Sequence, residues 1–264
     1  MKSKQAKKNI EPTPKEQSAA YESLVWDGDT YGGLVFKLAS RKTPLLEGFI
    51  DLVRANLARV IEAGPGAGGH TIKLAQEGFH ITSVESSSNA VERIMSRRTE
   101  HGLEGQIDVV TGCIFDYISK LFPGEQRHFY AQGVFQFFSN DDRQNLLRCL
   151  STMQQSGGVI GGSFKTKYDV LLHPERVSGE LVNDQFGTWA RASDGSGSRL
   201  FVNVDDMSPL LAEFTDNGYD VIATPRWYEV DCTDRKKVFS LPSVESKPTA
   251  KNPVDWIGIL AVKK

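Results

Sequence analysis

The sequence predicts an α/β protein in which helices cover both faces of a mostly parallel sheet. Three observations support this fold class. From about residue 43 onward, β-rich runs alternate with amphipathic helical segments, a glycine-rich turn joins the first strand to its helix, and hydroxyl or proline residues mark several helix starts. With 264 residues, the chain is long enough to bury a sizeable core without disulfides.

The N-terminal part differs in character from the rest of the chain. Residues 1–15 contain five lysines and few apolar side chains, so we expect a flexible basic tail. Residues 16–42 are rich in aromatic side chains, among them Tyr21, Trp26 and Tyr31. Such a segment needs a surface to dock on, and we expect it to act as a lid over a ligand.

The domain proper is expected to span residues 43–264. Its first helix begins at Thr43-Pro44, where a hydroxyl cap precedes a proline. Five parallel strands are predicted at 59–63, 79–85, 106–111, 128–135 and 159–164, with helices between them. Two further strands follow at 219–230 and 254–262, joined by a polar segment that we expect to be a loop.

A long insertion follows the fifth predicted strand. Residues 165–201 include Tyr168, His173, Trp189 and Arg191, and they are too many for a plain connection. We expect this insertion to cap the site together with the N-terminal lid segment.

Composition excludes several classes of function. The net charge of −2 argues against a general nucleic-acid or membrane-surface binder. The three cysteines are far apart and lack metal-ligand spacing, so neither a disulfide framework nor a cysteine-based zinc site is expected. The sequence shows no secretory signal and no apolar stretch of membrane-spanning length. We therefore expect a cytoplasmic protein.

The strongest motif is the glycine loop after the first predicted strand. Glycines there allow a sharp turn and the close approach of a ligand to the backbone. Gly64, Gly66 and Gly69 also satisfy a pattern that dinucleotide-binding folds share. An acid two residues before the loop, Glu62, would repel a pyrophosphate but would tolerate a cationic ligand. A second acid, Glu85, ends the second predicted strand and could accept both hydroxyls of a ribose.

These residues resemble the class I S-adenosylmethionine-dependent methyltransferase family. The family motif is an acid, any residue, and then Gly-x-Gly-x-Gly, and Glu62, Gly64, Gly66 and Gly68 match it. Glu85 matches the acid after strand two. The resemblance covers about residues 43–164. It implies a Rossmann-like, seven-stranded, mostly parallel sheet whose final strand is antiparallel and inserted beside the sixth.

The resemblance also implies roles for individual residues. Glu62 would position the amino-acid end of S-adenosylmethionine, the glycines would let the cofactor approach, and Glu85 would hold its ribose. Cys113 and Ile114 would flank the adenine, with Gln132 near the sulfonium. The family often has Asp where Cys113 stands, so here that contact is lost or Asp116 replaces it. The complete predicted cofactor set is Glu62, Gly64, Gly66, Gly68, Glu85, Ser86, Cys113, Ile114 and Gln132.

The expected reaction is an in-line displacement at the sulfonium methyl of S-adenosylmethionine, with a small molecule as acceptor. The motif of adenine N6-methyltransferases is absent from 132–135, which argues against a nucleic-acid base. No metal is expected, because Lys165-Thr166 rather than an acid follows the fifth strand. The candidates for contact with the acceptor are Tyr168, Asn140, Tyr21 and Tyr31.

Three alternatives remain open from the sequence. The same cofactor site could cyclise S-adenosylmethionine and release methylthioadenosine, as azetidine-2-carboxylate synthases, which resemble methyltransferases, do. The glycines could instead belong to a nicotinamide-dependent oxidoreductase, although Glu62 argues against it. The fold could also serve as a non-catalytic binding module.

Overall fold

The computed structural model describes residues 26–27, 30–31, 34–35, 42–124, 127–191, 193, 197–232, 235–243, 247–248 and 254–264. The expected basic tail therefore lies outside the described residues. Of the expected lid segment, the structure describes mainly the backbone of three short strands that pair in an antiparallel sheet. They are β1 (Trp26–Asp27), β2 (Thr30–Tyr31) and β3 (Leu34–Val35).

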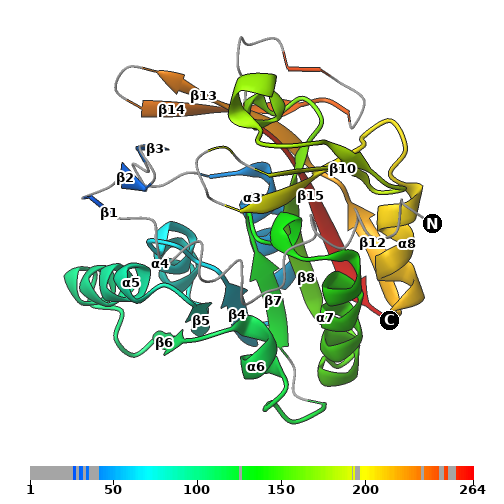
Figure 1. Cartoon of the computed structure of the whole chain (residues 1–264). Coiled ribbons are helices and arrows are strands. Elements are labelled where there is room, and N and C mark those ends of the chain that lie inside the picture. The colour runs from blue at the N-terminus through cyan, green and yellow to red at the C-terminus, as the bar shows by residue number, and fades with distance from the viewer. Residues whose placement is uncertain are drawn as a thin grey trace.

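A large mixed sheet forms the centre of the described chain (Figure 1), and its main path runs in the order β14-β13-β15-β8-β7-β4-β5-β6. Its parallel strands are β4 (Arg59–Ala63), β5 (Ile81–Glu85), β6 (Ile107–Thr111), β7 (Arg127–Ala131) and β8 (Val159–Thr166). Their carboxyl ends lie at one edge, where ligands bind in open α/β sheets.

The last strand, β15 (Val254–Lys263), runs antiparallel to β8 on one side and to β12 (Tyr219–Ala223) and β13 (Arg226–Cys232) on the other. This arrangement confirms the expected antiparallel insertion of the final strand beside the sixth. The pairing places Trp256 opposite Lys165, so the start of β15 reaches the carboxyl edge of the parallel strands.

The sheet contains more strands than the expected seven. The segment predicted to be a loop includes β14 (Arg235–Leu241), which forms a hairpin with β13. The insertion after β8 also forms strands, β9 (Val182–Asn183), β10 (Gly187–Arg191) and β11 (Ser198–Val202). The sequence predicted a loop in place of β14 because the segment is polar. Its backbone hydrogen bonds to β13 define the strand instead.

Helices pack on both faces of the sheet, as the sequence predicts. They are α3 (Pro44–Val53), α4 (Gly69–Gln76), α5 (Ser88–Glu100), α6 (Ile114–Ile118), α7 (Asn140–Met153) and α8 (Ser208–Asp216). Side chains of α3, α4 and α5 share one buried cluster, and those of α6, α7 and α8 share another. Figure 1 shows α3 and α7 on opposite sides of the strands. None of the helices in the described part of the chain is both long and apolar enough to cross a membrane.

The predicted fourth strand, 128–135, is too long. The strand ends at Ala131, and Gly133 takes a left-handed conformation with φ 74°. A short 3-10 helix, η1 (Phe135–Phe137), follows. The apolar run 134–138 therefore does not extend the sheet, and the early turn keeps Gln132 and Gly133 at its carboxyl edge.

Candidate active site

The glycine loop between β4 and α4 has a backbone that requires glycine. Gly64, Gly66 and Gly68 have φ values of 57°, 55° and 79°, which is the left-handed region that other residues rarely enter. A Cβ on Gly64 would also lie 2.6 Å from Cγ2 of Val134. The loop therefore passes close to the chain after β7, at the edge where a ligand is expected.

Glu85, the last residue of β5, is bonded to this loop. Its Oε2 accepts from the backbone N–H of Gly66 at 3.0 Å, and its Oε1 accepts from that of Ser87 at 3.0 Å. Burial raises the pKa of the Glu85 carboxyl, while the hydrogen bonds from Ser87 and Gly66 act in the opposite direction. Each oxygen can accept a further hydrogen bond, so the carboxylate can serve both the loop and a ribose.

Glu62 is turned into the protein. Its Oε2 accepts from the hydroxyl of Thr71 on α4 at 2.6 Å and lies 3.4 Å from that of Ser83 on β5. Burial raises the pKa of Glu62 to about 7, against the lowering effect of these two hydroxyls. Glu62 therefore links α4 to the sheet immediately before the glycine loop.

The side chain of Gln132 belongs to a buried polar network. Thr43 and Tyr130 both donate their hydroxyls to Oε1 of Gln132, at 2.9 Å each. Thr43 already accepts from the N–H of Leu46 as the cap of α3, so its own hydrogen points to Gln132. The Tyr130 hydroxyl also lies 3.1 Å from Nδ1 of His70. These bonds orient the amide so that Nε2 remains as a donor for a ligand.

Tyr130 keeps its proton in this network. Burial and the nearby charge of Glu62 raise the pKa of its hydroxyl well above the ordinary value. The sequence did not indicate His70, Tyr130 or Thr43 as site residues. Tyr130 lies inside a predicted strand, and Thr43 is 89 residues from Gln132.

The residues expected around the adenine lie on the neighbouring turn. Gly112 donates its N–H to the backbone carbonyl of Glu85 at 2.8 Å, which places the start of α6 beside the end of β5. Cys113 is a half-buried free thiol, and Ser86 is half-buried as well. Ile114 packs into the core below α6, whereas Asp116 is exposed.

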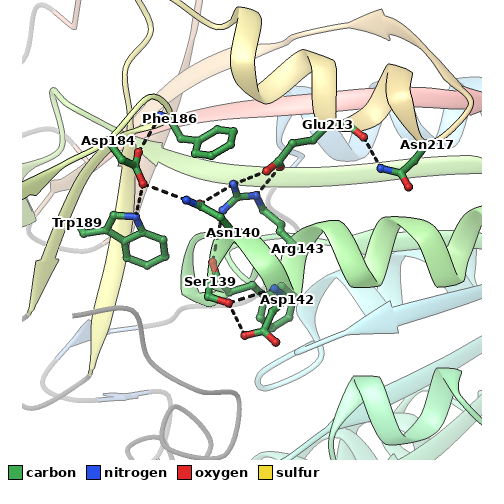
Figure 2. Close-up of polar contacts among 10 residues, drawn as sticks. Ser139, Asn140, Asp142, Arg143, Asp184, Phe186, Trp189, Glu213 and Asn217 are labelled. Atoms are coloured by element: carbon green, nitrogen blue, oxygen red, sulfur yellow. Dashed lines mark hydrogen bonds and ion pairs between the residues drawn. The ribbon is translucent and has the colours of Figure 1, made fainter. Parts of the chain in front are cut away.

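The four candidates for acceptor contact have different positions. Tyr168 is half-buried just beyond β8, with the Arg226 guanidinium 5.2 Å from its ring centre. Asn140 begins α7, and its side chain binds Asp184 and Arg143 (Figure 2). Tyr21 lies outside the described residues. Tyr31 lies in β2, but its side chain is not among those described.

Figure 2 shows how Asn140 connects α7 to the insertion. Asp184 accepts from Nδ2 of Asn140 at 3.1 Å and from the indole N–H of Trp189 at 3.0 Å. Arg143 donates to Oδ1 of Asn140 at 2.9 Å. It also forms a buried ion pair with Glu213 of α8 through two hydrogen bonds. Trp189, expected to face the ligand, is buried in the core. The insertion is thus joined to α7 and α8 by polar bonds.

Comparison with known sequences identifies a family that part of this chain resembles. Residues 60–158 match the sequence profile of a family described as a methyltransferase domain. This region is therefore similar to a methyltransferase domain. It includes the glycine loop, Glu85 and Gln132, and the match confirms the resemblance that the motifs predicted. No curated protein matches the chain.

Several solved structures of methyltransferases have a fold similar to that of this chain. An S-adenosylmethionine-dependent methyltransferase from Clostridium acetobutylicum is 13% identical with a TM-score of 0.53, covering 83% of this chain and 90% of its own. Magnesium protoporphyrin IX methyltransferase from Synechocystis is 14% identical, with a TM-score of 0.54 and coverages of 83% and 81%. A Burkholderia thailandensis didemethyltoxoflavin N1-methyltransferase is 15% identical, with a TM-score of 0.53 and coverages of 84% and 79%.

Metal ligands do not gather in the described part of the methyltransferase fold. No group of three or more His, Cys, Asp or Glu side chains among the described residues could hold a metal ion. The acids at the start of α7 instead serve its N-terminus, where Asp142 accepts from the Ser139 hydroxyl at 2.7 Å and Ser139 caps the helix.

Proposed function

We propose that this protein is an S-adenosylmethionine-dependent methyltransferase that acts on a small molecule. The observation that supports this most strongly is the Glu85 carboxylate, which ends β5 and binds the backbone of the glycine loop at Gly66. A ribose acceptor and a loop that can approach a ligand are thereby adjacent, inside a methyltransferase domain.

The residues present fit S-adenosylmethionine. Glu85 would accept the ribose hydroxyls, Ser86 and Cys113 would border the adenine, and the loop would pass the methionine end. Nε2 of Gln132 is a hydrogen-bond donor, so it suits the carboxylate of the methionine better than the sulfonium. When bound, the cofactor supplies an already activated methyl group. The protein then has to align the acceptor and exclude water.

The molecules bound in two of the similar solved structures support this choice of cofactor. The Synechocystis enzyme was crystallised with S-adenosylhomocysteine, and the Burkholderia enzyme with S-adenosylhomocysteine and its small-molecule substrate. We carry these findings over to this chain only as part of the proposal.

Tyr168 remains our first candidate for contact with the acceptor, because it follows β8 directly. The amide of Asn140 already has partners on both sides, so we assign it to positioning the insertion. The contacts of Tyr21 and Tyr31 with the acceptor stay predictions. Because Glu62 faces the interior, its charge alone does not argue against a nicotinamide cofactor, and the family match is the better argument.

The test is a mass-resolved assay of the purified protein with S-adenosylmethionine, with and without a small-molecule extract. Formation of S-adenosylhomocysteine that depends on the extract supports methyl transfer. Methylthioadenosine formed without the extract supports cyclisation instead. If neither product forms and neither nucleoside binds, the proposed function is wrong. A Glu85→Ala variant should be inactive, while Glu104→Ala, which changes an exposed acid, should retain activity.

A further inference from the structure

A buried lysine lies near the carboxyl end of β8, beyond the expected cofactor residues. Lys165 is 5% exposed, and its Nζ lies 2.7 Å from Oδ2 of Asp169. The same Nζ lies 3.9 Å from the centre of the Trp256 ring. A buried ammonium held by one carboxylate and one aromatic face retains further N–H donors.

Trp256 connects this lysine to the cofactor side of the site. A Cβ on Gly133 would lie 3.3 Å from Cη2 of Trp256, so the indole contacts the backbone immediately after Gln132. Gly133 is fixed there because its N–H donates to the Ser163 hydroxyl at 2.8 Å. The wall of the site therefore continues from Gln132 through Gly133 and Trp256 to Lys165.

One buried donor in this wall, Nε1 of Trp256, has no hydrogen-bond partner among the described residues. Most buried polar groups in proteins are paired, and an unpaired one calls for an explanation such as a bound ligand, ion or water. The ring that carries this donor is the ring that the Lys165 ammonium contacts.

Asp169 is the counter-ion that directly contacts the Lys165 ammonium. Burial lowers the pKa of this ammonium, and Asp169 and Glu229 oppose this effect, whereas Arg199 adds to it. Asp169 is itself held by the N–H groups of Asp255 at 2.9 Å and of Leu171 at 2.8 Å. It therefore acts as a positioning residue for the lysine.

We propose that Lys165 and the indole N–H of Trp256 hold the acceptor of the methyl transfer as an oxyanion, either an ionised hydroxyl or a carboxylate. This inference rests on the proposed function. A lone pair of the acceptor oxygen forms the new bond to the methyl carbon, the bond from that carbon to sulfur breaks, and its electron pair remains on sulfur. No proton moves in this step, because the acceptor enters without one, and no general base is required.

The test uses the protein loaded with S-adenosylhomocysteine and two matched pairs of probes. Benzoate is compared with benzamide, and 4-nitrophenolate with 4-nitroaniline, by calorimetry. We expect each anion to bind roughly tenfold or more tightly than its neutral partner, the size of one charged hydrogen bond. In Lys165→Met this preference should disappear, whereas in the control Lys264→Met, which alters an exposed lysine paired with Asp220, it should remain.

A Trp256→Phe variant keeps the ring and removes the donor, so it should reduce the preference severalfold. If the natural protein binds S-adenosylhomocysteine but prefers neither anion, or if the preference survives Lys165→Met, the inference is overturned while the proposed function stands. If Lys165→Met loses S-adenosylhomocysteine as well, Trp256→Phe decides, and an unchanged preference there overturns the inference. Failure of the natural protein to bind S-adenosylhomocysteine would instead count against the proposed function.

Discussion

At the scale of single residues, Glu85 binds the backbone of the glycine loop and is the residue we propose to hold the ribose of the cofactor. Replacing it by Ala removes the acceptor of the Gly66 and Ser87 N–H groups as well as the proposed ribose contact. Hydrogen bonds to a charged group contribute about 2 kcal/mol each, so we expect S-adenosylhomocysteine to bind at least ~30-fold more weakly. Calorimetry measures this, and Glu104→Ala should bind normally. Equal affinities of the Glu85→Ala variant and the natural protein would refute the assignment.

Glu62 predicts a pH dependence of stability. The pKa of Glu62 in the folded state, about 7, lies above its ordinary value of 4.5, so between these pH values the folded state holds a proton that the unfolded state has lost. Stability contributed by the protonated carboxyl is therefore lost as pH rises through this window. Relative to Glu62→Gln, the natural protein should lose on the order of 2 kcal/mol of unfolding free energy between about pH 5 and pH 8.

Urea unfolding of both proteins at the two pH values measures this difference. Glu85 and the other acids are common to both, so their titration cancels in the comparison. A difference in unfolding free energy that stays constant with pH would show that Glu62 is ionised throughout.

At the scale of elements, Asp184 joins the insertion to α7. One of its oxygens accepts from the N–H groups of Phe186 and Gly187, and the other accepts from Asn140 and Trp189. In Asp184→Asn, an amide NH2 would face these donors, which we expect to cost about 1–3 kcal/mol locally. Hydrogen exchange should quicken in β10 and β11 while β4 and β5 keep their protection. The control Asp205→Asn changes an exposed acid and should leave β10 and β11 protected.

The elements that the sequence predicted best are those with a local cause. Thr43 and Ser139 begin helices because their hydroxyls accept from the backbone N–H three residues on, which a short window of sequence contains. The end of β7 was missed because the apolar residues after Gly133 pack as a 3-10 turn instead of extending the strand.

At the scale of the whole molecule, pairing between strands that are far apart in the sequence brings residues together that local sequence patterns cannot identify. The glycine loop and Glu85 could be predicted because both lie at ends of consecutive strands that share one edge. The contact between Trp256 and Lys165 could not be predicted, because it depends on the antiparallel pairing of β15 with β8. Likewise, the bond between Thr43 and Gln132 spans 89 residues. The residues proposed to hold the cofactor could therefore be predicted from the sequence, and those proposed to hold the acceptor could not.

The central claim is that the carboxyl edge of this sheet binds S-adenosylmethionine through the glycine loop and Glu85. Calorimetric titration of the folded protein with S-adenosylhomocysteine, and separately with NADH, tests it most directly. We expect saturable binding of S-adenosylhomocysteine that Glu85→Ala weakens at least ~30-fold, and no binding of NADH. Binding of NADH without binding of S-adenosylhomocysteine would contradict it.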